Sequence, residues 1–150
     1  MIEALAAWGP GVFLRTSVWL YPLVSALHIL GIGMMVCCVL LMDAAVLGLW
    51  GRRAGQQAVV ASLRPVAVAA LVVAALSGLL LFSVRPGEYL ANPAFRLKLA
   101  LLGLALANAL FFIVFSGKAL ADGWRRGLAG LSALLWLGVL FCGRLIGFLD

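Results

Sequence analysis

The longest uncharged segment of this chain limits its fold more than any other feature. Residues 16–42 contain no Asp, Glu, Lys or Arg, and beyond Asp43 the apolar run continues to Trp50. A helix that crosses a bilayer needs about 20 mainly apolar residues. The whole chain is 66% hydrophobic and 11% charged, whereas a soluble domain has about 45–50% apolar and about 25% charged residues. The segment therefore indicates a membrane-spanning helix.

Three further segments have the same character, at residues 65–84, 99–117 and 127–143. Membrane barrels are built from alternating strands of about ten residues, but these runs are continuous and rich in Leu and Ala. Because lipid satisfies no backbone polar group, helices are the remaining solution. The sequence predicts an all-α polytopic membrane protein, a four-transmembrane-helix bundle. It forms a single domain over residues 1–150, with helices at about 17–50, 63–84, 93–117 and 125–149.

The expected helix ends carry typical punctuation. Ser62 with Pro65, and Asn92 with Pro93, are cap-then-proline patterns that predict the starts of the second and third helices. Trp19, Trp50 and Trp124 fall near expected ends, as in an interfacial aromatic belt. The first residues lack a basic region before an apolar one, so they do not resemble a cleavable signal peptide. A short interfacial helix is predicted over residues 2–8.

Loop charges predict the orientation. The first and third connections hold six basic residues: Arg52, Arg53, Arg64, Lys118, Arg125 and Arg126. The other ends hold five, some near the membrane: Arg15, Arg85, Arg96, Lys98 and Arg144. By the positive-inside rule the first group is cytoplasmic, and both termini are periplasmic in a bacterial inner membrane. The net charge of +6 is too scattered for a nucleic-acid groove, so the lipid bilayer is the expected environment.

Ionisable residues inside the spans are functional candidates. His28, the only histidine, lies about 16 Å into the first predicted helix at 1.5 Å per residue. One interpretation is a neutral imidazole hydrogen-bonded to a neighbouring helix. The other is an axial ligand to haem iron, for which neutral imidazole is a common donor. Residue type alone leaves both open.

Two cations approach the same outer half of the predicted bundle. Lys98 lies just inside the third helix and Arg144 near the end of the fourth, each with apolar residues on both sides. Long cations often snorkel to the interface without a partner, which explains Arg96 well. Haem carboxylates would also suit Lys98 and Arg144 through charge-assisted hydrogen bonds.

Asp43 is the only acid inside a span. It lies fifteen residues after His28, which is about 22 Å along a helix, so the two do not share a site. We expect Asp43 to pair with Arg64 or Arg52 and to tie the first helix to the second. A role in proton transfer is the alternative.

The cysteines and the missing motifs narrow the chemistry. Cys37, Cys38 and Cys142 lie in apolar runs, where free cysteines behave as small hydrophobes; thiol chemistry or metal binding is the alternative. There is no nucleotide-binding glycine loop, no Ser-His-Asp set and no closed-site metal cluster. No catalytic residue is predicted, and whether the chain is an enzyme is left open. A second iron ligand would have to be Lys98, a methionine or another subunit, or be absent.

Five stretches together resemble a group of uncharacterised bacterial four-helix membrane proteins. They are SVWLYPLVSALHILGIG, MDAAVLGLW, RPVAVAALVVAALSGLLLF, PGEYLANPAFRLKLALLGLALANA and LSALLWLGVLFCGRLIGF, and they cover nearly the whole chain. The resemblance implies fold and location, but that group has no assigned activity. Its Asp followed closely by Arg is replaced here by Asp43-Ala44-Ala45.

A more distant similarity points to haem. A first-helix His, an Arg-Pro start to a Gly-containing second helix and a Lys just inside the third resemble the haem-containing four-helix protoporphyrinogen oxidases. They also resemble the membrane domain of the copper-resistance D family. In the oxidases that His and Lys are the functional pair and haem b is bound, which implies His28 and Lys98 here. The oxidases' other histidines and tryptophan-rich motif are missing, so the activity is not carried over.

The sequence thus predicts a haem b-binding, redox-linked membrane subunit that passes electrons within the membrane. His28 is the expected iron ligand, with Lys98 and Arg144 as propionate or second-ligand partners. Its expected partners are other membrane or periplasmic redox subunits, or further copies of the chain. The alternative is a non-catalytic accessory or assembly subunit without a cofactor. Copper handling is disfavoured because no Met or His cluster faces outward.

Overall fold

A computed structural model describes residues 13–14, 16–49, 53–115 and 121–148. Four long helices dominate this part of the chain: α3 (Leu20–Leu47), α4 (Arg53–Val84), α6 (Pro93–Phe115) and α7 (Asp122–Leu145). A six-residue helix, α5 (Pro86–Ala91), and a 3-10 turn over Ile146–Phe148 complete the described elements. The predicted all-α fold with four long helices is confirmed.

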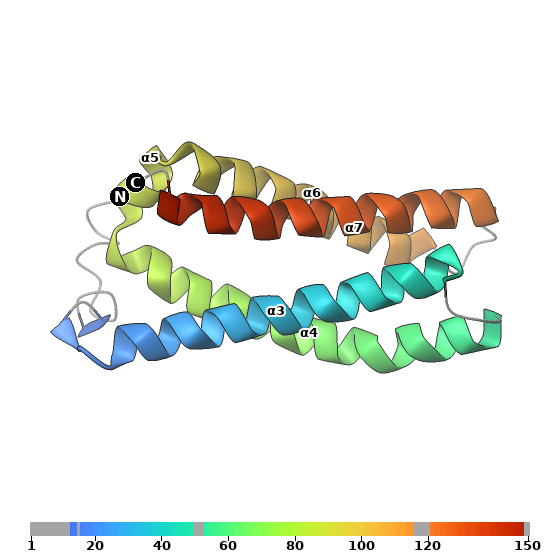
Figure 1. Cartoon of the computed structure of the whole chain (residues 1–150), viewed down its shortest axis with the longest axis horizontal. Coiled ribbons are helices and arrows are strands. Elements are labelled where there is room, and N and C mark those ends of the chain that lie inside the picture. The colour runs from blue at the N-terminus through green and yellow to red at the C-terminus, as the bar shows by residue number, and fades with distance from the viewer. Residues whose placement is uncertain (1–12, 15, 50–52, 116–120, 149–150) are drawn as a thin grey trace.

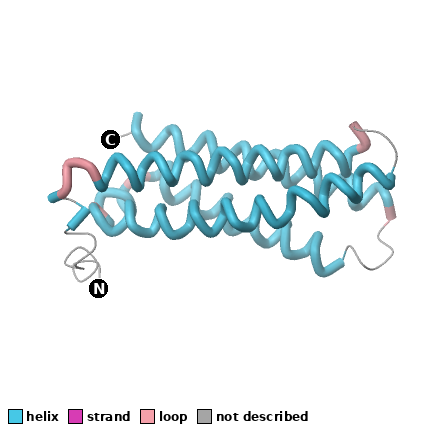
Figure 2. Tube along the Cα trace, turned by 90° about the horizontal axis from the view of Figure 1, so that it is seen from below, coloured by secondary structure: helices cyan, strands magenta, loops and turns pink. Residues whose placement is uncertain are grey.

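The four long helices run alternately up and down along one axis (Figures 1 and 2). α3 packs against α4 and also against α7, and α6 packs against α7. The first turn of α3 and the last turn of α7 therefore lie at one end of the bundle (Figure 1). The last turns of α3 and α6 and the first turns of α4 and α7 lie at the other end (Figure 1). We call these the terminal end and the loop end.

All four long helices are long and apolar enough to cross a membrane. Many large apolar side chains point outward, among them Leu79, Leu134 and Phe141, each more than 60% exposed. In water so large an apolar surface would favour aggregation, whereas in a bilayer it faces lipid tails. The chain is thus a multi-pass membrane protein.

Two helix boundaries are set by local chemistry. The side-chain oxygen of Asn92 accepts hydrogen bonds from the backbone N–H groups of Ala94 (2.9 Å) and Phe95 (3.3 Å). This is the N-cap geometry that the Asn-Pro pattern predicts, so the predicted start of the third span is confirmed. α3 ends at Gly48, whose positive φ of 86° is a conformation that glycine adopts without strain.

The predicted start of the second span is wrong by ten residues. It was expected at residue 63, but α4 begins at Arg53 and Pro65 lies inside it. A proline removes one backbone hydrogen bond, yet the Ala- and Gln-rich residues before it are good helix formers, so the helix continues through. The other boundaries shift less: α3 covers 20–47, and α7 begins at 122. The predicted segment 2–8, like Trp50, lies outside the described residues.

The interior is built around one apolar cluster in the middle of the bundle. Its buried members come from all four long helices: Met35, Val36, Ala70, Ala105 and Trp136. Gly31 allows α3 to approach α4 closely, because a Cβ there would lie 3.0–3.3 Å from backbone atoms of Ala70 and Ala74. This cluster divides the bundle interior into two halves, and each half holds polar groups.

Candidate functional site

His28 is fixed to the neighbouring helix in the terminal half of the bundle. Its Nδ1 atom lies 2.9 Å from the carbonyl oxygen of Ala74 and 3.1 Å from the Ser77 hydroxyl, both on α4. The Ser77 hydroxyl itself donates to the Val73 carbonyl at 2.6 Å, so it accepts from His28. Both partners are acceptors, which assigns the proton to Nδ1. The lone pair of a neutral ring is then on Nε2.

Gly78 makes room for the imidazole ring. A Cβ at this position would lie 2.8 Å from the Cε1 atom of His28, closer than side chains are found to approach. The α4 segment from Ala74 to Gly78 therefore supplies the Ala74 carbonyl as an acceptor, the Ser77 hydroxyl, and space for the ring at Gly78. Ser77 thus takes part in a hydrogen bond between α3 and α4.

The structure brings Lys98 into the same half of the bundle. Lys98 is half-buried on α6, and its Nζ lies 3.5 Å from the position that a Cβ of Gly143 would occupy on α7. His28 on α3 and Lys98 on α6, which the sequence predicts as a pair, therefore lie in the same half of the bundle, and no hydrogen bond joins them.

Arg144 lies apart from this pair. Its side chain is exposed, and its guanidinium stacks over the Phe148 ring at 5.0 Å from the centroid. This cation–π contact, at the end of α7, matches an arginine that snorkels to the interface. No hydrogen bond or ion pair joins Arg144 to His28 or Lys98, all three of which the structure describes.

The loop half holds a second polar cluster around Asp43. The expected ion pair with Arg64 is wrong: both side chains line one cavity of about 150 Å³, but they do not reach ion-pair distance. Asp43 is instead hydrogen-bonded to the Ser132 side chain of α7. One carboxylate oxygen of Asp43, Oδ2, is buried and has no hydrogen-bond partner. The alternative partner, Arg52, lies outside the described residues.

Asn108 supports this second cluster from α6. Its side-chain amide donates a hydrogen bond to the Leu128 carbonyl of α7 at 3.2 Å, so Asn108 joins α6 to α7. Asn108 also lines the cavity that contains Asp43. Ser132 was not singled out in the sequence. Its position among apolar residues of the last span is the only sequence signal that marks it.

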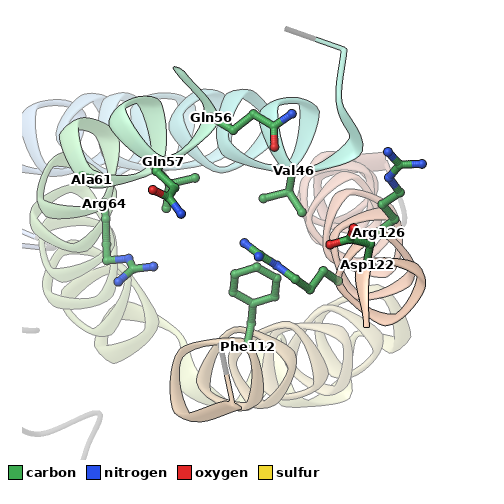
Figure 3. A pocket seen from close by; sticks show the side chains of 10 residues that line it. Val46, Gln56, Gln57, Ala61, Arg64, Phe112, Asp122 and Arg126 are labelled. Atoms are coloured by element: carbon green, nitrogen blue, oxygen red, sulfur yellow. The ribbon is translucent and has the colours of Figure 1, made fainter. Parts of the chain in front are cut away.

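A wider cleft of about 400 Å³ lies at the loop end of the bundle (Figure 3). Its polar lining comes from α4 and α7: Gln56, Gln57, Arg64, Asp122, Arg125 and Arg126. In Figure 3 the Arg64 side chain projects from α4 into this space. The cleft and the Asp43 cavity share four lining residues, Val46, Val60, Arg64 and Phe112.

Neither half holds a ready-made multi-ligand metal centre. In the part of the chain that the structure describes, no three His, Cys, Asp or Glu side chains gather as a metal site. Cys38 and Cys142 are buried and Cys37 is exposed; all three are free, as expected. Any metal at His28 would therefore need most of its ligands from elsewhere, as a porphyrin provides.

Comparison with protein-family models, with curated proteins and with solved structures found no match for this chain.

Proposed function

We propose that this chain is a haem b-binding, redox-linked subunit of a bacterial inner membrane, which passes electrons within the membrane. The observation that carries the proposal is the state of His28. Its Nδ1–H group is held by the Ala74 carbonyl, while Nε2 has no hydrogen-bond partner among the described residues. In a metal-ligating histidine, the ring nitrogen that does not bind the metal commonly donates such a hydrogen bond, which orients the ring.

The residues around His28 fit the group in donor type. A haem supplies four equatorial nitrogens and a reversible one-electron couple, so the protein needs one axial nitrogen and partners for two carboxylates. His28 would supply the axial nitrogen. Lys98 would hold a propionate or a second axial position. Arg144, exposed beside Phe148, could meet a propionate only near the terminal end, so we assign it the weaker contribution.

The orientation belongs to the same proposal. Arg64, Arg125 and Arg126 gather at the loop end, where they line the cleft. By the positive-inside rule this end faces the cytoplasm. His28 and Lys98 would then lie in the periplasmic half of the membrane, where other membrane or periplasmic redox subunits, or a second copy of this chain, could exchange electrons with the haem.

A second candidate is a cofactor-free accessory or assembly subunit. The hydrogen bonds from His28 to Ala74 and Ser77 favour it, because they would also tie α3 to α4 without any metal. The two candidates differ in the role of Nε2, which matters only for ligation.

Two substitutions of His28 separate these candidates. His28→Asn keeps an N–H donor close to the Nδ1 position but removes Nε2, whereas His28→Ala removes both. The protein is produced with haem available and with its native partners present, and its visible spectrum and thermal unfolding are measured. We expect a Soret band and b-type reduced peaks in the unchanged chain, no band in either variant, and lower stability only in His28→Ala. A colourless unchanged chain would contradict the haem proposal and leave the accessory role.

A further inference from the structure

Among the residues that the structure describes, the Oδ2 atom of Asp43 is the one buried side-chain oxygen or nitrogen without a hydrogen-bond partner. Asp43 lies four residues before the end of α3, and the Oδ2 atom is buried without a hydrogen-bond partner. A buried polar group of this kind is costly, and a carboxylate more so than an amide or hydroxyl. Such an oxygen is usually satisfied by ordered water, by an ion or by a proton.

The cavity beside Asp43 is lined mainly by apolar side chains, yet it has the volume for water and a few polar groups that could bind it. Its volume is about 150 Å³, and one water needs roughly 10–15 Å³ of such space together with two to four polar partners. Arg64 of α4, Asn108 of α6 and Ser132 of α7 line it, so polar groups come from each of the other long helices. One N–H of the Asn108 side-chain amide donates to the Leu128 carbonyl, which leaves its second N–H as a donor and its oxygen as an acceptor.

This cavity continues toward the loop end. Val46, Val60, Arg64 and Phe112 line both the cavity and the wider cleft, so the two spaces adjoin. The cleft reaches Gln56 near the start of α4 and Asp122 at the start of α7 (Figure 3).

The path ends at the apolar cluster. Met35 and Trp136 line the inner end of the cavity and belong to the buried cluster with Val36, Ala70 and Ala105. Beyond that cluster lies His28, about 22 Å from Asp43 along α3 at 1.5 Å per residue. Among the described residues, the cavity and the cleft therefore extend from Asp43 toward the loop end.

We propose that Asp43 is a proton-binding site at the inner end of this one-sided aqueous path, which we call the half-channel. A proton enters from water at the loop end, is passed along the waters of the cavity and binds the carboxylate to give the carboxylic acid. It leaves by the same route, so no other reactant is needed.

The surroundings of Asp43 fit this role. Among the described side chains, Arg64 is the only charged one that lines the cavity from α4, and those that line it from α6 and α7 are uncharged. The Asp122, Arg125 and Arg126 side chains belong to the outer cleft. Because Arg64 lines both spaces without an ion pair, it can favour the ionised carboxylate without blocking it. The proposal does not depend on haem binding.

Infrared difference spectroscopy of the full-length protein in lipid tests the proton site directly. Acidification should produce a carboxylic acid C=O band that is absent from Asp43→Asn. The band should persist in Glu88→Gln, which changes an exposed acid paired with Arg85 at the terminal end. A spectrum in which Asp43→Asn leaves every acid-induced band unchanged would overturn the proposal. Loss of the band on adding sodium ions would also overturn it, because Asp43 would then hold a metal cation.

Cysteine labelling tests the aqueous path independently. In a chain whose three native cysteines are replaced by alanine, Val60→Cys places a thiol where the cleft and cavity meet, and Ala61→Cys places one in the cleft. Ala70→Cys, in the apolar cluster, is the control. An anionic, membrane-impermeant thiosulfonate should modify the first two only from the side that carries the loop end, and should not modify the third. If Val60→Cys and Ala61→Cys both stay unmodified in folded protein from either side, the half-channel does not exist.

Discussion

The Nδ1 atom of His28 lies 2.9 Å from the carbonyl oxygen of Ala74, so the only histidine of the chain joins α3 to α4. A carbonyl inside a helix already accepts a backbone hydrogen bond, and its second lone pair serves the imidazole. The same contact has two consequences. It stabilises the α3–α4 pair, and it fixes which ring nitrogen remains free for a ligand.

Gly78→Ala should disturb this contact. The new Cβ would lie 2.8 Å from the Cε1 atom of His28, so the ring or the helix must move. We expect a loss of about 1–3 kcal/mol in stability, the usual cost of overpacking. Thermal unfolding in detergent measures it. Gly103→Ala is the matched control, because a Cβ at Gly103 meets nothing within 4 Å. Equal unfolding temperatures for the two variants would contradict the packing of His28 against α4.

Asn92→Ala should weaken the start of α6. It removes the acceptor for the N–H groups of Ala94 and Phe95, and a lost N-cap costs about 0.5–2 kcal/mol. Ser62→Ala, the other predicted cap, should have little effect because Ser62 lies exposed inside α4. Unfolding followed by circular dichroism compares the two. A larger loss in Ser62→Ala would mean that α4 begins after that serine.

These two positions show what the sequence can predict. The Asn92 cap acts on backbone groups two and three residues away, so a local pattern is enough to predict it. Ser62 and Pro65 carry the same pattern, but there the helix continues because the preceding residues favour it and one lost hydrogen bond is tolerated in a long helix. The number and type of spans follow from hydropathy, which is summed over many residues and is insensitive to such exceptions.

Side-chain contacts between helices are harder to predict, because they depend on how each helix is rotated about its axis. Asp43 and Arg64 face one cavity yet do not touch. Gly31 and Gly78 lie where two helices approach closely. A Cβ at Gly33 or Gly103 would have no neighbour within 4 Å, although the sequence does not distinguish these glycines from the first two. Lys98 is likewise half-buried and Arg144 exposed, although both have apolar neighbours in the sequence.

Asp43→Asn tests whether Asp43 forms the ion pair with Arg64 or Arg52 that the sequence predicts. Loss of an ion pair would lower stability, but Asp43 has no such pair among the described residues, and a buried amide costs less than an unpartnered carboxylate. We therefore expect the unfolding temperature in detergent to stay the same or rise. Ser132→Ala, which removes the hydroxyl bonded to Asp43, should lower it instead. A clear destabilisation by Asp43→Asn would restore the ion-pair hypothesis.

Reporter fusions test the orientation. A reporter placed after Asp150 should be active only in the periplasm, and one inserted near Gly55 only in the cytoplasm, because the loop end carries Arg64, Arg125 and Arg126. Enzymatic reporters that work in one compartment alone give the answer. The reversed pattern would place His28 in the cytoplasmic half and would make the half-channel open to the periplasm.

Lys98→Met tests the part of the haem proposal that concerns the partner of His28. Methionine keeps an unbranched chain against Gly143, where the Lys98 stem lies, but removes the ammonium group. If this cation holds a propionate or ligates the iron, the variant should retain less haem per protein than the unchanged chain after the same detergent washes. Arg144→Leu should lose less haem, because Arg144 is exposed and its guanidinium already stacks on Phe148.

The Soret absorbance relative to protein measures retention, and carbon monoxide binding by the reduced form reports an open axial position. A carbon monoxide adduct that forms only in Lys98→Met would make Lys98 the second axial ligand. Equal haem content in Lys98→Met and the unchanged chain, with an unchanged spectrum, would remove Lys98 from the site.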